Sequence, residues 1–330
     1  MQAIRIHPAA SSITPFSASN PAPPSSLVLD QDVEIPQPKP GQALVRVHAA
    51  TVTRGELTWP ESYRKDFHIP GYDVYGVVES VEGLSEFKPG DEVFAMVHTR
   101  RGSTWAEYAV VDAHELALKP KNLRWAEAAT VPMSALTAWQ ALFVKAGVPE
   151  PGVDAPKTTG SLSRVLVTGA SGAVGSYIVQ LAALVGLSVV AASSSNQRNG
   201  QFLRSLGAAE TIEYADMRHH SFDLIIDTVG GEPLSQSWSI ISNDGTLVSV
   251  DSSSFAFANS PPEGKEAVNA IFFIVEPSGK QLGKISRALE VGLVRPFLAH
   301  TFPLAEARAA YEKASGRTDR RGKVVLVIRP

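Results

Sequence analysis

The chain has 330 residues, of which 44% are hydrophobic and 19% charged, a composition typical of a globular protein with about two domains. Its 30 Lys and Arg residues nearly balance its 33 Asp and Glu residues, so we expect no broad basic surface for nucleic acid or an anionic membrane. The absence of cysteine excludes disulfides, cysteine-ligated zinc, iron–sulfur clusters and a thiol nucleophile.

The N-terminal residues lack the apolar run of a signal peptide. The longest uncharged apolar stretch, residues 177–192, is too short to span a bilayer. We therefore expect a cytoplasmic protein with no membrane partner.

The first 120 residues predict β-structure. Eight of the 23 prolines fall within the first 40 residues, which disfavours long helices there. Short runs that start at Gln42, Tyr75 and Trp105 alternate roughly as strands do, and a turn at Lys88 leads into another strand. Several short strands with Pro and Gly turns predict a small barrel or sandwich.

The pattern changes near residue 123. Helical spacing of apolar residues covers 124–129 and 134–145, and 147–163 reads as a surface loop. From Arg164 strands alternate with helices, which predicts a parallel, doubly wound sheet: strands 165–168, 187–192, 222–227 and 245–250, with helices 173–185 and 200–206. Helices 279–291 and 304–314 follow, and a last strand, 323–328, could return to the first domain.

The segment from Arg164 to Ser176 has the pattern of a nucleotide-binding turn. Gly169, Gly172 and Gly175 lie three apart between an apolar strand and a helix, which lets the backbone approach a pyrophosphate at the helix N-terminus. The usual G-x-G-x-x-G would need glycine at Ala170. The alternative interpretation is a tight turn without a ligand.

The residues after the second strand indicate which dinucleotide binds. NAD sites place an acid there, but no carboxylate follows Val190 until Glu210. Hydroxyls and a guanidinium suit the 2′-phosphate of NADPH, and Ser193, Ser194 and Arg198 supply them. The alternative is a polar loop that faces water.

Several segments together resemble the medium-chain dehydrogenase/reductase superfamily, in its zinc-free quinone and enone reductase branch. They are residues 54–60, 70–78, 128–142, 168–176, 222–231 and 321–326. The resemblance implies a GroES-like, β-rich substrate domain, 1–123 with 276–330, and a Rossmann doubly wound cofactor domain, 124–275, with a cleft between them. Members are commonly dimers, so a homodimer is possible.

The resemblance also marks cofactor residues. The turn contributes Gly169, Ser171, Gly172, Ala173 and Val174. Thr137 and Lys323 are expected near the phosphates, Val229 and Gly230 by the nicotinamide ribose, and the backbone of Phe273 to Val275 at the carboxamide.

Candidate catalytic residues lie in the substrate domain. Tyr72 stands where zinc-dependent relatives carry a histidine ligand, and Thr51 and Thr53 end a strand near the expected nicotinamide. Tyr63 follows in a loop with Glu56 and Trp59, for which a structural or pocket-wall role was the alternative. Asp73 is interpreted as a structural partner of Lys323.

The resemblance implies metal-free transfer of a hydride from NADPH to the C=C of an α,β-unsaturated carbonyl or to a quinone. A hydroxyl would stabilise the enolate. Two alternatives stay open: a pathway-specific ene-reductase of secondary metabolism, and an NADPH-binding protein without turnover that acts structurally or in regulation.

Overall fold

The computed structural model describes residues 1–10, 14–83, 85–152, 164–316 and 319–329. Most of the loop expected at 147–163 therefore lies outside the described residues. The chain forms two compact units, Met1–Met133 with Pro277–Pro330, and Ser134–Glu276. The first unit thus extends ten residues beyond the expected boundary at 123, because helix α1 (Trp125–Ala129) packs on strands β3 and β4.

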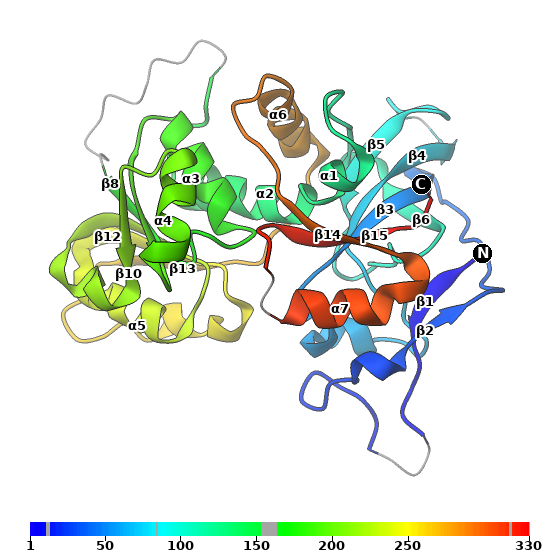
Figure 1. The fold of residues 1–330 in the computed structure, drawn as a ribbon, viewed down its shortest axis with the longest axis horizontal. Coiled ribbons are helices and arrows are strands. Elements are labelled where there is room, and N and C mark those ends of the chain that lie inside the picture. Colours follow the sequence, from blue (N-terminus) through cyan, green and yellow to red (C-terminus); the bar gives the residue numbers. More distant parts are fainter. Residues whose placement is uncertain (11–13, 84, 153–163, 317–318, 330) are drawn as a thin grey trace. The chain divides into compact units, whose positions relative to one another are not determined.

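The first unit is built on a seven-stranded sheet (Figure 1). Its strand order is β14-β15-β3-β4-β5-β7, and β6 pairs with β3. The strands are β3 (Gln42–Val52), β4 (Asp73–Glu82), β5 (Glu92–Met96), β6 (Tyr108–Asp112), β7 (Leu116–Leu118), β14 (Leu298–Pro303) and β15 (Lys323–Val327). The predicted β-rich domain is confirmed, because all pairs except β14–β15 are antiparallel.

The last strand returns to the N-terminal part of the chain, as expected. Strand β15 pairs with β3, with Val324 opposite Val52 and Val327 opposite Ala49. Helix α7 (Ala307–Ser315) packs on β15 and buries Ala307, Ala310 and Tyr311 in a core shared with Trp105. Sequence analysis did not predict β7, β14 or the separate pair β1 (Ala3–Ile6) and β2 (Leu27–Asp30).

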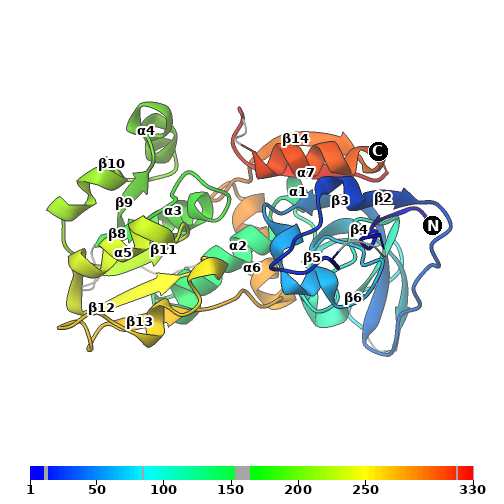
Figure 2. The same cartoon turned by 90° about the horizontal axis from the view of Figure 1, so that it is seen from below.

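The second unit is a six-stranded sheet in which every pair is parallel (Figures 1 and 2). Its strands are β8 (Arg164–Val167), β9 (Ser188–Ser193), β10 (Glu210–Glu213), β11 (Phe222–Asp227), β12 (Ile241–Ser249) and β13 (Asn269–Phe272). The order β10-β9-β8-β11-β12-β13 reverses direction between β8 and β11, as in a Rossmann sheet, whose ligands bind at that reversal. The predicted doubly wound sheet is confirmed.

The helices of the second unit connect these strands. They are α2 (Pro132–Trp139), which starts in the first unit and continues as a π-helical segment, Gln140–Lys145, then α3 (Gly175–Leu184), α4 (Asn196–Ser205) and α5 (Gly231–Ile240). Helix α6 (Gly279–Glu290) belongs to the first unit. Short β10 and β13 and helix α5 escaped the sequence prediction, since Gly231 and Pro233 lower the helical signal of α5.

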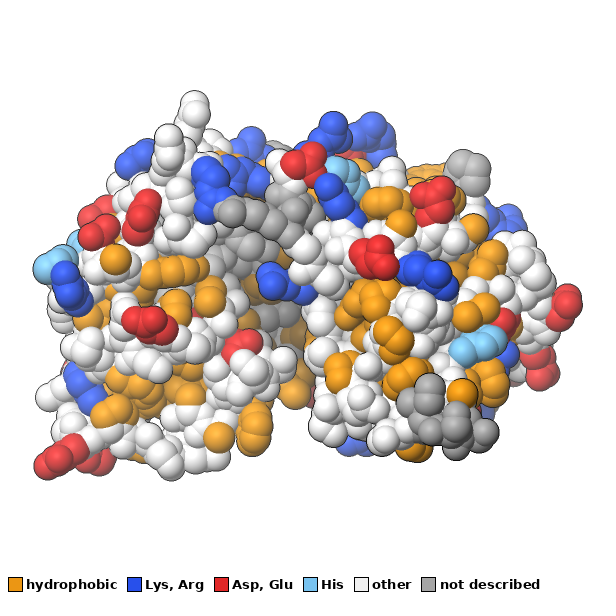
Figure 3. Space-filling view, turned by 60° about the horizontal axis from the view of Figure 1, so that its bottom comes forward, with side chains coloured by type: hydrophobic (Ala, Val, Ile, Leu, Met, Phe, Trp, Pro, Cys, Tyr) orange, Lys and Arg blue, Asp and Glu red, His pale blue; other side chains and the backbone are white. Residues whose placement is uncertain are grey.

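The distribution of charged side chains on the surface agrees with the nearly equal numbers of acidic and basic residues. On the face shown in Figure 3, acidic and basic side chains are interspersed among apolar ones. Among the described residues, no helix is long and apolar enough to cross a bilayer.

Candidate cofactor and substrate sites

The glycine turn in the second unit has a backbone that only glycine suits. Gly169 follows β8 with φ +62°, and a Cβ there would lie 2.3 Å from Oγ1 of Thr228. A Cβ on Gly175 would lie 2.2 Å from the carbonyl oxygen of Gly169, so α3 begins directly against the turn. Ala170, which stands where the usual pattern has glycine, is fully buried.

This turn presents backbone donors. Within the described part of the chain, the N–H groups of Ser171, Ala173 and Val174 have no hydrogen-bond acceptor, and Gly172 and Ala173 are exposed. Unpaired N–H groups at the start of a helix, with the positive end of its dipole, form a site for a phosphate group. The sequence-predicted turn residues are therefore brought together in a geometry that fits a pyrophosphate.

A buried carboxylate that sequence analysis missed holds this region. Asp227, at the end of β11, accepts hydrogen bonds from the hydroxyls of Thr168 (2.5 Å) and Ser249 (2.8 Å) and from the Gly230 N–H (3.0 Å). These partners come from β8, β12 and the turn after β11. The Val229–Gly230 turn is thereby fixed beside the glycine turn. A buried Asp at a strand end before Thr-x-Gly-Gly was the available signal.

The polar side chains after β9 differ in their exposure to solvent. Ser193 is buried, and its hydroxyl donates to the Ser195 carbonyl (3.3 Å) and accepts from Asn199 Nδ2 (3.2 Å), so it is occupied within the protein. Ser194 and Arg198 are exposed, with Nη2 of Arg198 3.5 Å from the Ser194 hydroxyl. Only this second pair is placed to meet a ligand phosphate.

One acid that sequence analysis did not consider lies near this loop. Glu213, at the end of β10, accepts the Asn196 N–H at 2.7 Å, which pairs the carboxylate with the first residue of α4. Tyr214 follows it, and its hydroxyl accepts the Gly169 N–H at 3.2 Å beneath the turn. Burial raises the pKa of Tyr214, so this hydroxyl stays protonated.

The remaining cofactor candidates of this unit differ in exposure. Thr137 is buried in α2, and Val229 is 40% exposed after β11. Phe273 is buried with Lys145 Nζ 5.4 Å from its ring centroid, and Val275 is partly exposed. Their predicted contacts with the nicotinamide remain predictions.

In the first unit, Asp73 joins three strands and the start of α2. Its Oδ2 accepts the Thr51 hydroxyl and Lys323 Nζ, both at 2.6 Å, and its Oδ1 accepts the Met133 N–H at 2.7 Å. Thr51, Asp73 and Lys323 are all buried. The expected Asp73–Lys323 pair is present, but Thr51 is a structural donor, and Lys323 is committed to Asp73, which argues against its predicted contact with a cofactor phosphate.

Tyr72 is the strongest candidate for substrate chemistry. It is 1% exposed, its ring lies 5.3 Å from that of Trp59, and its hydroxyl has no hydrogen-bond partner among the described residues. An unpaired buried hydroxyl costs about 1–3 kcal/mol, which a ligand acceptor would recover. Burial, and then the Glu56 carboxylate, raises the pKa of Tyr72, so the hydroxyl remains a donor at neutral pH.

Two other candidate catalytic residues, Thr53 and Tyr63, differ in whether their hydroxyls are engaged by the protein. Thr53 is partly exposed, and among the described residues its hydroxyl has the Met133 sulfur as its one partner, at 3.9 Å. Tyr63 donates to the Leu57 carbonyl and accepts the Ala22 N–H at 2.8 Å. Both capacities of the Tyr63 hydroxyl are used by backbone, so its predicted catalytic role is replaced by a structural one, whereas Thr53 remains available.

Glu56 is a buried carboxyl with one free oxygen. Its Oε1 accepts the N–H of Gly71, directly before Tyr72, at 2.5 Å, and its Oε2 has no partner among the residues described. Burial raises the pKa of Glu56 to about 7, against the opposing effects of the Gly71 N–H and Lys323. Glu56 therefore holds the segment that carries Tyr72 and changes charge near neutral pH.

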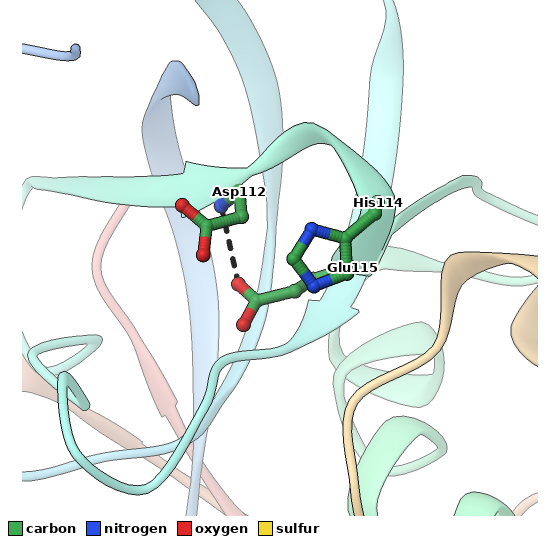
Figure 4. A group of neighbouring side chains, drawn as sticks. All are labelled: Asp112, His114 and Glu115. Atoms are coloured by element: carbon green, nitrogen blue, oxygen red, sulfur yellow. Dashed lines mark hydrogen bonds between the residues drawn. The ribbon is translucent and has the colours of Figure 1, made fainter. Parts of the chain in front are cut away.

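One group of acids and a histidine lies close enough to share a cation, within the residues that the structure covers. Figure 4 shows Asp112, His114 and Glu115, with Glu115 accepting the Asp112 N–H (3.1 Å). Arg101 forms ion pairs with Asp112, at 2.8 Å, and with Glu115. The Arg101 guanidinium thus pairs with both carboxylates and occupies part of the space and charge that a cation would need.

Two family descriptions match the chain. Residues 39–121 match the alcohol dehydrogenase GroES-like domain, and residues 206–326 match a family described as zinc-binding dehydrogenase. A probable zinc-binding mitochondrial oxidoreductase of the fungus Arthroderma benhamiae is 37% identical over 310 residues, which cover 89% of this chain and 91% of the relative. The chain belongs to the medium-chain dehydrogenase/reductase superfamily.

Other oxidoreductases are similar to this chain along most of its length. A human mitochondrial NAD(P)H oxidoreductase is 30% identical, covering 88% of this chain and 82% of its own. The tomato (Solanum lycopersicum) 2-methylene-furan-3-one reductase is 32% identical, covering 91% and 75%. The solved quinone oxidoreductase of Coxiella burnetii has a TM-score of 0.81 at 25% identity, covering 100% and 99%.

The chain is therefore an oxidoreductase with a GroES-like domain and a Rossmann-like sheet. The similarities favour a nicotinamide cofactor and a small-molecule substrate. Two of the relatives are described as mitochondrial, so the cytoplasmic location stays a prediction from the sequence.

Proposed function

We propose that the protein is an NADPH-dependent, zinc-independent reductase of quinones or α,β-unsaturated carbonyl compounds. The observation that carries the proposal is the pairing, in one unit, of a glycine turn with unpaired N–H groups and an exposed Ser194–Arg198 pair. The turn suits a pyrophosphate, and a guanidinium beside a hydroxyl suits the 2′-phosphate of NADPH. The carboxylate of Glu213, on the neighbouring strand β10, is engaged by the Asn196 N–H.

In the proposed reaction the first unit supplies hydrogen-bond donors. Bound NADPH supplies the hydride for the β-carbon or the quinone ring. Negative charge then develops on the substrate oxygen, and the Tyr72 hydroxyl, which has no partner of its own within the described residues, donates to it. The partly exposed Thr53 hydroxyl is a second donor, and the indole of Trp59 provides an apolar wall beside Tyr72.

Zinc independence rests on the donors that the chain offers. The sequence has no thiolate, and Tyr72, a poor zinc ligand while protonated, stands at the position of a histidine ligand in zinc-dependent relatives. In the acidic group around Glu115, both carboxylates pair with the Arg101 guanidinium, which competes with a metal cation there. A phenol that stabilises an enolate removes the need for a Lewis acid, so we propose reduction of activated C=C bonds rather than oxidation of simple alcohols.

The test is consumption of NADPH with a panel of enones and quinones, before and after treatment with a chelator. We expect turnover with at least one class, products saturated at the C=C bond or reduced to hydroquinones, and no effect of the chelator. Activity confined to one complex enone would support a pathway-specific ene-reductase. Tight NADPH binding without turnover would support a structural or regulatory protein and contradict the proposal.

Two further properties belong to the proposal. We propose a homodimer because members of the superfamily are commonly dimers, and sedimentation or light scattering tests this oligomeric state. The cytoplasmic location remains a prediction, and fractionation with a mitochondrial marker tests it.

A further inference from the structure

A pocket unrelated to the candidate catalytic residues lies in the first unit. Its volume is about 620 Å³, enough for a small metabolite. The walls come from the segments before β3, after Pro60, around residue 101 and along β6. None of its lining residues has a role in the proposed reaction: the polar and charged ones are Glu34, Gln37, Lys39, Gln42, Glu61, Arg64, Lys65, His68, Arg100, Arg101, Ser103 and Tyr108.

The lining has an excess of positive charge. Five side chains are cationic and two are acidic. Two of the cations are balanced: Arg64 pairs with Glu61 at 3.4 Å, and Arg101 pairs with carboxylates outside the pocket. The other three, Lys39, Lys65 and Arg100, are exposed and form no ion pair with any described residue.

A buried histidine adds a directed polar group. His68 is 3% exposed, lines the pocket, and its Nε2 has no hydrogen-bond partner among the residues described. Burial, with a smaller effect of Lys65, lowers the pKa of His68 to about 4, so its ring is neutral at physiological pH and carries one N–H. A buried ring nitrogen without a partner costs about 1–3 kcal/mol, which a ligand oxygen at this point would recover.

The pocket lies close to the loop that carries the catalytic candidate. A Cβ on Gly102 would lie 3.6 Å from Cε1 of His68 and 3.2 Å from Cε1 of Tyr72. Gly102 has φ +55°, a conformation that favours glycine and keeps the backbone against both rings. His68, which lines the pocket, and Tyr72 therefore both lie close to Gly102.

We propose that this pocket binds a small polyanion, a molecule with two or more phosphate or carboxylate groups, held by Lys65, Arg100 and Lys39 at its rim and by the Nε2 of His68 at its base. Several cations around one cavity select multivalent over monovalent anions because the Coulomb energies add. In the tautomer with its proton on Nε2, the neutral His68 ring donates a directed hydrogen bond to an oxyanion without an additional charge. The site is independent of the proposed reductase activity.

Calorimetric titration of the full chain tests the site with inorganic pyrophosphate, citrate and acetate as probes. The titrations are made with NADPH present and repeated with the Ser194→Ala/Arg198→Ala variant, which removes the other candidate anion site. We expect saturable binding of pyrophosphate or citrate that weakens with salt, and none of acetate. The preferred polyanion identifies phosphate or carboxylate as the natural group.

Variants locate the binding. Lys65→Ala/Arg100→Ala should weaken polyanion binding at least about ten-fold, whereas the control pair Lys88→Ala/Lys121→Ala, which removes the same charge elsewhere, should change it less than about two-fold. His68→Phe should weaken binding about five-fold or more, and His68→Gln, which keeps an N–H donor, should restore most of it. Thermal unfolding checks that each variant is folded.

Equal losses in the test and control pairs would overturn the proposal, as would the absence of saturable binding or binding that disappears with Ser194→Ala/Arg198→Ala alone. Because the readout is heat of binding, a failure of enone or quinone reduction leaves this result unaffected.

Discussion

Lys323 donates a hydrogen bond from Nζ to Oδ2 of Asp73 at 2.6 Å, although 250 residues separate them in the chain. Both side chains are buried, and the bond fastens the first residue of β15 to the first residue of β4. The bond therefore spans β3, which lies between β15 and β4 in the sheet. We therefore expect this buried ion pair to contribute to the stability of the fold.

Lys323→Met should lower the free energy of unfolding by about 3–5 kcal/mol, because it leaves the Asp73 carboxylate buried without its cation. Urea unfolding measures the change. Lys313→Met, which breaks an exposed pair with Asp319, is the control and should cost less than about 1 kcal/mol. If Lys323 contacts a cofactor phosphate instead, the variant will keep its stability and lose NADPH affinity.

Glu56 should make stability depend on pH. Its pKa in the folded protein is about 7, above the ordinary value of 4.5, so the folded state holds this proton more tightly than the unfolded state. The resulting stabilisation is complete below about pH 4.5 and is lost as the pH rises through 7, a change of about 3 kcal/mol.

The difference in unfolding free energy between Glu56→Gln and the wild type isolates this contribution. We expect the variant to gain relative to the wild type between pH 5 and pH 8, while Glu79→Gln, at an exposed position, shows no such trend. Parallel pH curves for Glu56→Gln and wild type would refute the assignment.

Tyr72→Phe should reduce kcat by about 100-fold, the usual effect of removing one donor from a developing oxyanion. Binding of NADPH should stay unchanged. The control is Tyr75→Phe, since Tyr75 is also buried and its hydroxyl has no partner within the described part of the chain, yet it lies beside His48 and Trp125. Unchanged turnover in Tyr72→Phe would remove Tyr72 from the mechanism.

Gly169→Ala should abolish NADPH binding or unfold the second unit. The new methyl group would meet the Thr228 hydroxyl at 2.3 Å, in a backbone with positive φ. Gly147→Ala separates the two effects, because Gly147 also has positive φ but nothing within 4 Å of its Cβ position. The control should cost only about 1 kcal/mol, and equal effects of both substitutions would contradict the steric account.

Sequence reasoning reached the fold because its signals are local. The strand–glycine–helix pattern around Gly169 and the alternation of strands and helices after Arg164 predict the parallel sheet, which the structure confirms. The pattern around Lys323 predicted the returning strand. Short elements such as β10 and β13 were missed, since four residues carry little periodicity.

The site was less accessible from sequence because it depends on which hydrogen bonds each side chain makes. Thr51, Thr53 and Tyr63 all offer a hydroxyl, and the sequence does not show which of them is free. In the structure the Thr51 hydroxyl donates to Asp73, and the Tyr63 hydroxyl bonds with backbone atoms. Ser193 and Ser194 are adjacent, yet one is buried and the other exposed. Asp227 and Glu213 act through tertiary contacts, and the place of Asp227 before Thr-x-Gly-Gly indicates its role without naming its partners.

The central claim is the choice of NADPH, and one measurement tests it most directly: dissociation constants of NADPH and NADH for the wild type, Arg198→Ala and the same-helix control Arg204→Ala. We predict that the wild type prefers NADPH, that Arg198→Ala weakens NADPH binding about 10- to 100-fold while NADH changes less than about two-fold, and that Arg204→Ala changes neither. Equal affinity of the wild type for the two cofactors, or equal losses for both in Arg198→Ala, would contradict it.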